Sequence, residues 1–130
     1  MPPRKPPRIS EAEWDVMRVV WEKSPVTASD VAQALSPRRG WSDRTVKTLL
    51  ARLVKKRALA FDVEGKRYLY RPRLAREACE RAESDSFLDR VFGGAASPLL
   101  AYLVREKGLT REEIAEIRRL LAEREKGGKS

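Results

Sequence analysis

The stretch WSDRTVKTLLARLVKKR, residues Trp41 to Arg57, decides the fold of this chain. The Ser42 hydroxyl is expected to cap the free N–H groups of a first helical turn. Trp41 is expected to fold back onto Val46 as a hydrophobic staple. Apolar residues then recur at i, i+3, i+4 and i+7, on one stripe of a helix: Val46, Leu49, Leu50 and Leu53. The pattern predicts a helix with one buried face.

The opposite face of this predicted helix carries cations, hydroxyl groups and one small residue. At 100° per residue the face holds Arg44, Thr48, Ala51 and Lys55, flanked by Thr45, Arg52 and Lys47. Arginine and lysine reach guanine edges in a DNA major groove, and threonine meets a thymine methyl group or a phosphate. The face is therefore a candidate DNA-reading surface. The alternative is an amphipathic helix whose basic face is only solvated.

Positive charge is concentrated in the half of the chain that contains this helix. Residues 1–73 hold 17 Lys and Arg against 8 Asp and Glu, whereas residues 74–130 hold 11 of each. A localised basic surface is typical of proteins that bind polyanions. An anionic membrane would attract this surface too, but the apolar stripe of the helix is expected to be buried in the protein core rather than to face a membrane. Double-stranded DNA is therefore the expected partner.

The chain lacks the residues of several common catalytic and metal sites. It has no histidine and one cysteine, Cys79, so it cannot form a Ser-His-Asp site, a Cys-His pair or a cysteine/histidine zinc site within one chain. We expect no enzyme activity, no metal and no other cofactor. Cys79 is interpreted as a small buried hydrophobe, with a redox sensor as the alternative.

The chain shows no signal for membrane insertion or export. No run of 18 apolar residues exists, and the first residues, MPPRKPPR, lack the apolar segment of a secretory signal. These features favour a cytoplasmic location. Residues 1–8 are interpreted as a disordered basic arm.

Two further helices are predicted ahead of Trp41. Capping-box patterns open them, one at Ser10 with Glu13 and one at Thr27 with Asp30. The first is expected to run to about Lys23, and the second to about Leu35 before a turn over residues 36–40. The first helix has apolar residues at helical spacing, which we assign to the core: Trp14, Met17, Val20 and Trp21. Together the elements predict a helix-turn-helix.

After Arg57 the apolar period changes from helical to alternating. Residues 59–63 and 66–71 read as two strands joined by a turn at Glu64-Gly65, with Lys66 and Arg67 near the tip. A hairpin after a recognition helix is a wing, whose cations contact the phosphate backbone. Residues 9–73 are therefore predicted to form a winged helix. The alternative is that the tip charges are ordinary turn residues.

Residues 74–125 read as helices with thin apolar stripes, followed by a polar tail at 126–130. One of these helices is expected from Pro98 to Lys107, and a capping box of Thr110 with Glu113 is expected to open the last one. Three such helices cannot easily bury their stripes against one another in so short a segment. We expect a dimerisation region that uses Leu99, Leu100, Leu103, Ile114, Ile117, Leu120 and Leu121. A two-fold dimer would place two recognition helices in successive major grooves. The alternative is a small bundle packed on its own winged helix.

Four motifs make the chain resemble a known family from about Ile9 to Leu121. They are ISEAEWDVMRVVW at Ile9–Trp21, WSDRTVKTLLARLVKK at Trp41–Lys56, YLYRP at Tyr68–Pro72 and LTREEIAEIRRLL at Leu109–Leu121. With these motifs the chain resembles the penicillinase-repressor family of bacterial transcription regulators, the BlaI/MecI/CopY type. The resemblance implies a homodimeric winged-helix repressor on inverted-repeat operators with a TACA/TGTA-like core.

The resemblance also implies roles for particular residues. The family's DNA contacts carried over by position are Arg44, Thr45, Lys47, Thr48 and Arg52. Of these we expect Arg44, Thr45 and Thr48 to read bases, and Lys47, Arg52 and the wing to contact phosphates. A rival hypothesis is a protein-interaction winged helix with an incidental basic face, which would bind DNA weakly and without sequence preference.

The chain departs from the family pattern at three places. Arg57 stands where members usually have a glycine, so it must adopt a left-handed conformation or the helix must end in another way. The cysteine-rich metal motif of copper-responsive members is missing. Members that respond to β-lactams are cleaved at an Asn-Phe bond, and the matching segment here is Ala101-Tyr102-Leu103. This segment is a candidate cleavage region for a membrane sensor protease, and the signal that releases the repressor is left open.

Overall fold

The computed structural model describes residues 6–127 and divides into two compact units, one ending at Ser84 and one beginning at Asp85. Residues 1–5 of the expected basic arm and 128–130 of the expected tail lie outside the described residues. The division falls inside a helix, at the Ser84-Asp85-Ser86 stretch that interrupts its apolar stripe.

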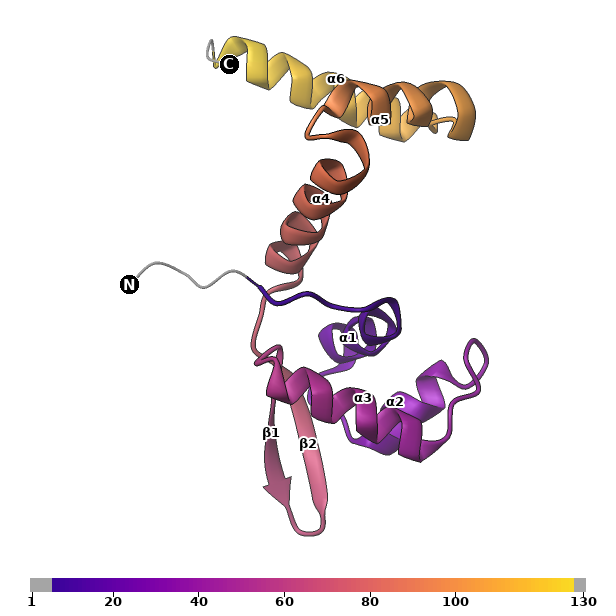
Figure 1. Cartoon of the computed structure of the whole chain (residues 1–130), viewed down its shortest axis with the longest axis vertical. Helices are drawn as coiled ribbons and strands as arrows, with labels where there is room; N and C mark the ends of the chain where they lie inside the picture. Colours follow the sequence, from indigo (N-terminus) through magenta and orange to yellow (C-terminus); the bar gives the residue numbers. More distant parts are fainter. Residues whose placement is uncertain (1–5, 128–130) are drawn as a thin grey trace. The chain divides into compact units, whose positions relative to one another are not determined.

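The first unit is a three-helix core with a β-hairpin. It contains α1 (Glu11–Lys23), α2 (Ala28–Leu35) and α3 (Asp43–Lys55), followed by the antiparallel strands β1 (Leu59–Glu64) and β2 (Arg67–Pro72). Figure 1 shows the hairpin leaving the C-terminal end of α3 and extending beyond the three helices. The predicted winged helix-turn-helix, mainly α with a small β-hairpin, is confirmed.

Each of the three helices begins at the residue that the capping patterns predict. The side chains of Ser10, Thr27 and Ser42 accept hydrogen bonds from the backbone N–H three residues ahead. At Ser10 and Thr27 the return bond is also made, by Glu13 and Asp30, so both capping boxes are confirmed. Capping satisfies donors that the first turn leaves without helical partners. These local bonds set where each helix starts.

The apolar stripe of α3 forms the centre of the core. Its members Val46, Leu49, Leu50 and Leu53 are all buried, and they cluster with buried residues of α1 and α2: Val16, Met17, Val20, Val31 and Leu35. The two tryptophans of α1 lie at the edge instead. Trp21 is half-buried and its Nε1 donates to the carbonyl of Leu74 at 2.9 Å. Trp14 is half-buried outside the core cluster, so its assignment to the core was wrong.

The hairpin turn lies one residue later than predicted. Glu64 pairs with Arg67 across the strands, so the turn is made by Gly65 and Lys66, with Gly65 at a left-handed φ of 65°. A bridge ties the hairpin to the connection between α1 and α2. Tyr70 N donates to Val26 O at 2.7 Å, and Val26 N donates to Tyr70 O at 3.0 Å. This bridge anchors the wing to the helical core.

Arg57 ends α3 in the left-handed conformation usually taken by glycine, with φ of 67°. Its N–H donates to Val54 O at 2.9 Å, and the N–H of Ala58 donates to Leu53 O at 2.9 Å. These two bonds form a Schellman motif, and the buried Ala58 and Leu53 are in the positions that make its apolar contact. The helix therefore ends in a motif that glycine usually closes, with arginine in the glycine position.

Replacing Arg57 by glycine is expected to raise the free energy of unfolding by about 0.5–1 kcal/mol. A left-handed conformation costs a non-glycine residue about 1–2 kcal/mol, and glycine removes this cost. Part of the resulting gain in stability is offset by the greater freedom of glycine in the unfolded chain. Urea unfolding measures the difference. Arg57→Ala is the control, since it removes the long side chain but keeps the unfavourable φ, and it should bring no gain. Equal stabilisation by both variants would contradict the backbone explanation.

The second unit contains the rest of α4 (Arg76–Phe92), then α5 (Ala96–Tyr102), the π-helical segment η1 (Leu103–Lys107) and α6 (Arg111–Lys126). The helix expected from Pro98 to Lys107 thus changes its winding at Leu103. Gly108 ends it with φ of 82°, and the predicted capping box of Thr110 with Glu113 opens α6. None of the described residues from Asp85 onward is buried. Over residues 85–127 the second unit therefore has no buried core of its own.

Candidate nucleic-acid interface

The exposed face of α3 holds every residue that the sequence assigned to it. Within residues 6–127 all of them are exposed: Arg44, Thr45, Lys47, Thr48, Ala51, Arg52 and Lys55. No ion pair among the described residues engages the four cations of this set. Their charge is therefore available to a ligand.

The wing tip and α3 form the two sides of one open groove of about 850 Å³. Lys47 and Ala51 line it from α3, and Lys66 and Arg67 line it from the wing. The remaining lining residues come from the start of α2 and from β2: Thr27, Ala28, Ser29, Asp30, Tyr68 and Tyr70. The structure thus brings two predicted helix positions together with both predicted wing cations, while Arg44, Thr45, Thr48, Arg52 and Lys55 lie outside the groove lining. The basic surface is concave on one side of the helix.

The cations of the wing are not equivalent. Arg67 donates to a carboxylate oxygen of Glu64 at 3.0 Å, and Arg71 donates to Asp62 at 3.2 Å. No ion pair among the described residues engages Lys66, which occupies the turn itself. Exposed ion pairs are weak, but they reduce the charge a guanidinium offers to a phosphate. Lys66 is therefore the stronger phosphate-binding candidate of the two tip residues.

The two threonines of the α3 face differ in what they offer. The Thr48 hydroxyl donates to the carbonyl of Arg44 at 3.0 Å, so its oxygen is left as an acceptor and its methyl group as an apolar contact. The Thr45 hydroxyl instead accepts from the Ser42 hydroxyl at 3.2 Å. Its own proton is left for a phosphate or a base acceptor. The helix cap thus orients one of the predicted base-reading groups.

Stacked aromatic rings stiffen the wing beside this groove. Phe61 and Tyr68 stack with ring centroids 4.4 Å apart, and Tyr70 packs at a tilt against both. Tyr70 is also buried in the core and bridged to Val26. Aromatic pairs across strands stabilise a hairpin that is otherwise only marginally stable. They hold Lys66 at a defined place relative to α3.

The C-terminal end of α3 is held by a buried carboxylate of α1. Lys56 Nζ donates to Glu13 Oε1 at 2.5 Å and to the carbonyl of Arg8 at 2.8 Å. Burial by itself raises the pKa of Glu13, but the bonds from Lys56 and Ser10 outweigh it and hold that pKa below its ordinary value. Glu13 is thus ionised at neutral pH and clamps α3 to α1.

Acidification is expected to remove the stability that this clamp provides. Since the folded-state pKa of Glu13 is lowered, its contribution is fully present above the unfolded pKa of about 4.3, and it is lost as the pH falls through the lower folded value. Urea unfolding of Glu13→Gln and the unchanged protein should therefore give different free energies of unfolding at pH 7, and the difference should shrink as the pH falls below the unfolded pKa of about 4.3. Glu22→Gln, on the exposed part of the same helix, should leave the pH dependence unchanged. A constant difference across this pH range would contradict the prediction.

The sequence patterns missed the residues that hold α3 in place. Lys56 lies within Trp41–Arg57, but no local pattern distinguishes it. The buried acids Glu13 and Asp15 are not distinguished by a pattern either, apart from the capping position of Glu13. The available signal was two acidic residues among the apolar positions of α1, which is unusual unless they are paired. The partners that tie them to the rest of the domain, Lys56 and Arg39, lie far along the chain, so spacing alone does not identify these pairs.

Among residues 6–127 no cluster of side chains is suited to hold a metal ion. Over the same residues no single helix is long and apolar enough to cross a membrane, and only the bent pair of Arg76–Phe92 with Ala96–Lys107 passes that test jointly.

A helix-turn-helix core, a wing and an unpaired cationic helix face together define a winged-helix DNA-binding protein. The family model of the penicillinase repressors matches residues 9–123. The chain is 35% identical over 120 residues to the penicillinase repressor of Bacillus licheniformis, covering 92% of this chain and 94% of that protein. The chain belongs to the penicillinase-repressor family, whose members regulate transcription and are not enzymes.

Solved structures agree with this assignment over the first unit. The solution structure of the DNA-binding domain of the repressor BlaI is 39% identical, with a TM-score of 0.52, and covers 58% of this chain and 92% of that chain. The Bacillus licheniformis BlaI monomeric form in complex with the blaP half-operator is also 39% identical, with a TM-score of 0.50, covering 57% of this chain and 90% of that chain. The chain is therefore a DNA-binding transcriptional repressor by family and fold.

Proposed function

We propose that this chain represses transcription as a homodimer bound to an inverted-repeat operator with a TACA/TGTA-like core. The observation that carries the proposal is the face of α3 opposite the core, where the exposed cations make no ion pair within residues 6–127. The related BlaI structure with a half-operator supports DNA as the ligand. The term half-operator implies an operator with two halves, and the symmetry of such a site fits a two-fold dimer.

Within the proposed complex the residues divide into two groups. Arg44, Thr45 and Thr48 read base edges in the major groove, because they lie on the N-terminal half of α3 and keep donor or acceptor capacity. The cations Lys47, Arg52, Lys55, Lys66 and Arg67 contact phosphates, which gives affinity and dependence on salt but little sequence information.

The proposed dimer rests on the uncovered apolar side chains of the second unit. Among its described residues α5 and α6 form no substantial packing contact with each other. Leu120 and Leu121 are 49% and 55% exposed, and the other large hydrophobic side chains exposed among residues 85–127 are Phe87, Val91, Leu100, Tyr102, Val104 and Ile114. Exposed apolar surface of this kind marks an interface, and a second copy of the chain is the partner that would cover it.

The proposal is tested by fluorescence-anisotropy titration with two labelled duplexes of about 30 base pairs, long enough for two half-sites one helical turn apart. One duplex carries a TACA/TGTA inverted repeat and the other a scrambled sequence, each at several salt concentrations. We expect much tighter binding to the repeat, with one dimer on each duplex. Equal and steeply salt-dependent binding to both would favour the rival, a winged helix with an incidental basic face, or a different operator.

Site selection from a random duplex pool separates those two outcomes. Enrichment of another inverted repeat would keep the repressor and correct its operator. No enrichment at all would overturn sequence-specific recognition.

The proposal also covers how the repressor is released from DNA. We infer that release occurs by cleavage near Ala101-Tyr102-Leu103 by a membrane sensor protease. Support comes from the exposed Tyr102 and from the change of winding at Leu103, since π-helical turns frequently accompany functional sites. Mass spectrometry of the chain recovered from cells before and after induction tests this; an intact chain in derepressed cells would contradict it. Because the ligand is an operator, the expected place of action is the cytoplasm, where bacterial DNA lies.

A further inference from the structure

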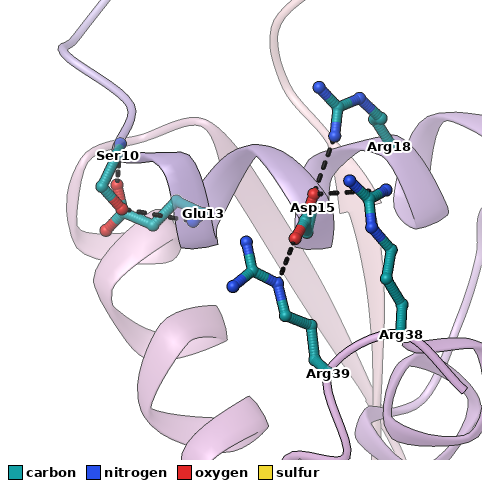
Figure 2. A network of polar contacts seen from close by, with 6 residues as sticks. All are labelled: Ser10, Glu13, Asp15, Arg18, Arg38 and Arg39. Carbon is teal, nitrogen blue, oxygen red and sulfur yellow. Dashed lines mark hydrogen bonds and ion pairs between the residues drawn. The ribbon is translucent and has the colours of Figure 1, made fainter. Parts of the chain in front are cut away.

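Asp15 is a buried carboxylate surrounded by three arginines. Its residue is 3% exposed, and it lies on α1. Arg18 Nη1 donates to its Oδ1 at 2.7 Å and Arg39 Nε donates to its Oδ2 at 2.6 Å, while Arg38 Nη1 is 3.9 Å away. Figure 2 shows the three guanidinium groups around this one carboxylate. Two of the arginines come from the turn between α2 and α3.

Arg39 connects this carboxylate to the start of the recognition helix. Its guanidinium lies 4.9 Å from the centre of the Trp41 ring, and Trp41 is half-buried against the core directly before the cap Ser42. An arginine held over an aromatic face and hydrogen-bonded to a carboxylate has little freedom to move. A chain of contacts thus runs from α1 through Arg39 and Trp41 to the first turn of α3.

Local bonds shape the turn but do not orient it against α1. Arg39 N donates to Leu35 O at 2.7 Å and Gly40 N donates to Ser36 O at 3.0 Å, with Gly40 at φ of 61°. All of these bonds are within the turn or to the end of α2. Within residues 6–127 the hydrogen bond from Arg39 to Asp15 is the one that joins this turn to α1, and Arg38 adds an ion pair to the same carboxylate at 3.9 Å. The side chain of Arg39 is 31% exposed against 67% for that of Arg38, so the Arg39 pair is the better shielded from solvent.

We infer that Asp15 is a positioning residue for DNA recognition: through Arg39 and Trp41 it sets how the N-terminal turn of α3 is presented to the DNA. The inference rests on the proposed function and adds a residue that does not face the DNA. Base readout requires side chains placed closely, so a small shift of the first turn weakens specific contacts. Phosphate contacts tolerate the same shift, because they depend mainly on charge.

Electrostatics and positioning predict opposite effects of Asp15→Asn. Removing a negative charge from a protein with formal net charge +9 should slightly strengthen binding to any DNA. Loss of positioning should instead weaken operator binding, and we expect the ratio of operator to scrambled-duplex affinity to fall about tenfold, comparable to losing part of one base contact. The matched control is Glu22→Gln, which removes the same charge from an exposed position of α1 and should keep the ratio.

The arginines provide a second matched pair. Arg39→Gln should lower the ratio as Asp15→Asn does, whereas the adjacent Arg38→Gln should have little effect on it. The double variant Asp15→Asn/Arg39→Gln should lower the ratio of operator to scrambled-duplex affinity no further than either single variant, because both substitutions remove the same contact. Should Asp15→Asn fail to fold, Arg39→Gln still decides the matter. An Asp15→Asn or Arg39→Gln protein with the unchanged ratio would overturn the inference.

A readout without DNA separates this inference from the proposed function. Asp15→Asn should increase the rate of hydrogen exchange, relative to the unchanged protein, at the amides of Thr45 and Val46 in the first turn of α3. The increase should be smaller at Leu53, near the other end of the helix. A purely structural role would raise exchange throughout the core alike, and that result would overturn positioning. If site selection with the unchanged protein enriches no sequence, the proposed function fails, and the exchange pattern still decides on Asp15.

Discussion

Replacing Arg44 by alanine is expected to remove about 1–3 kcal/mol of discrimination between operator and scrambled DNA, the range for one good base contact. Arg44 is the second residue of α3, on an exposed face at the end of the helix whose residues reach base edges in helix-turn-helix complexes. No ion pair within residues 6–127 competes for its guanidinium. Anisotropy titrations against both duplexes measure the loss.

Lys66→Ala is the matched comparison for Arg44→Ala. It removes one exposed cation from the wing turn, so it should weaken binding to both duplexes equally and reduce the slope of log affinity against log salt by about one unit. The two variants thus separate base reading from phosphate binding. If Arg44→Ala weakened both duplexes equally, as Lys66→Ala should, the assignment of Arg44 to base reading would be wrong.

Replacing Leu120 by glutamate is expected to convert the proposed dimer into monomers. Leu120 lies on the apolar stripe of α6 with Ile114, Ile117 and Leu121. On another side of the helix Arg119 pairs with Glu116 at 2.6 Å and with Glu123 at 2.5 Å. These pairs are within α6, so these three charges already have partners, and the uncharged stripe is the surface that a second copy would cover. A carboxylate buried there without a partner would cost several kcal/mol.

Sedimentation velocity measures this effect, with Ala115→Glu as the control. Ala115 lies nearly opposite the stripe at 100° per residue, so the same charge introduced there should leave the association state unchanged. A Leu120→Glu protein that still sediments as a dimer would remove α6 from the interface. Dissociation of both variants would point to a general effect of charge on the unit instead.

The parts of the fold that follow from neighbouring residues were predictable from sequence. A capping box depends on two side chains three positions apart, and the start of each predicted box matches the structure at Ser10, Thr27 and Thr110. The apolar stripe of α3 likewise follows from one helical period. The exposed face opposite that stripe was therefore predictable too, although its roles in DNA binding are still predictions.

The parts that depend on distant pairings were not predictable. Glu13 meets Lys56, and Asp15 meets Arg39, only after α1 and α3 have packed, and no local spacing relates these residues. Trp14 shares the helical spacing of Met17 and Trp21, yet it lies outside the core cluster because spacing identifies a helix face only broadly. The change of winding at Leu103 is also absent from the apolar pattern, which is nearly continuous there.

The bridge between Val26 and Tyr70 bears on the order in which this protein folds. It joins two segments far apart in sequence, and Tyr70 then contributes its side chain to the same core as α1, α2 and α3. Closing so long a loop is entropically unfavourable until the helices are in place, so the hairpin is expected to dock last. A nascent chain that ended at Arg57 would lack Leu59 and Tyr70 from its core. The wing is therefore expected to be the last part of the domain to pack, after the three helices.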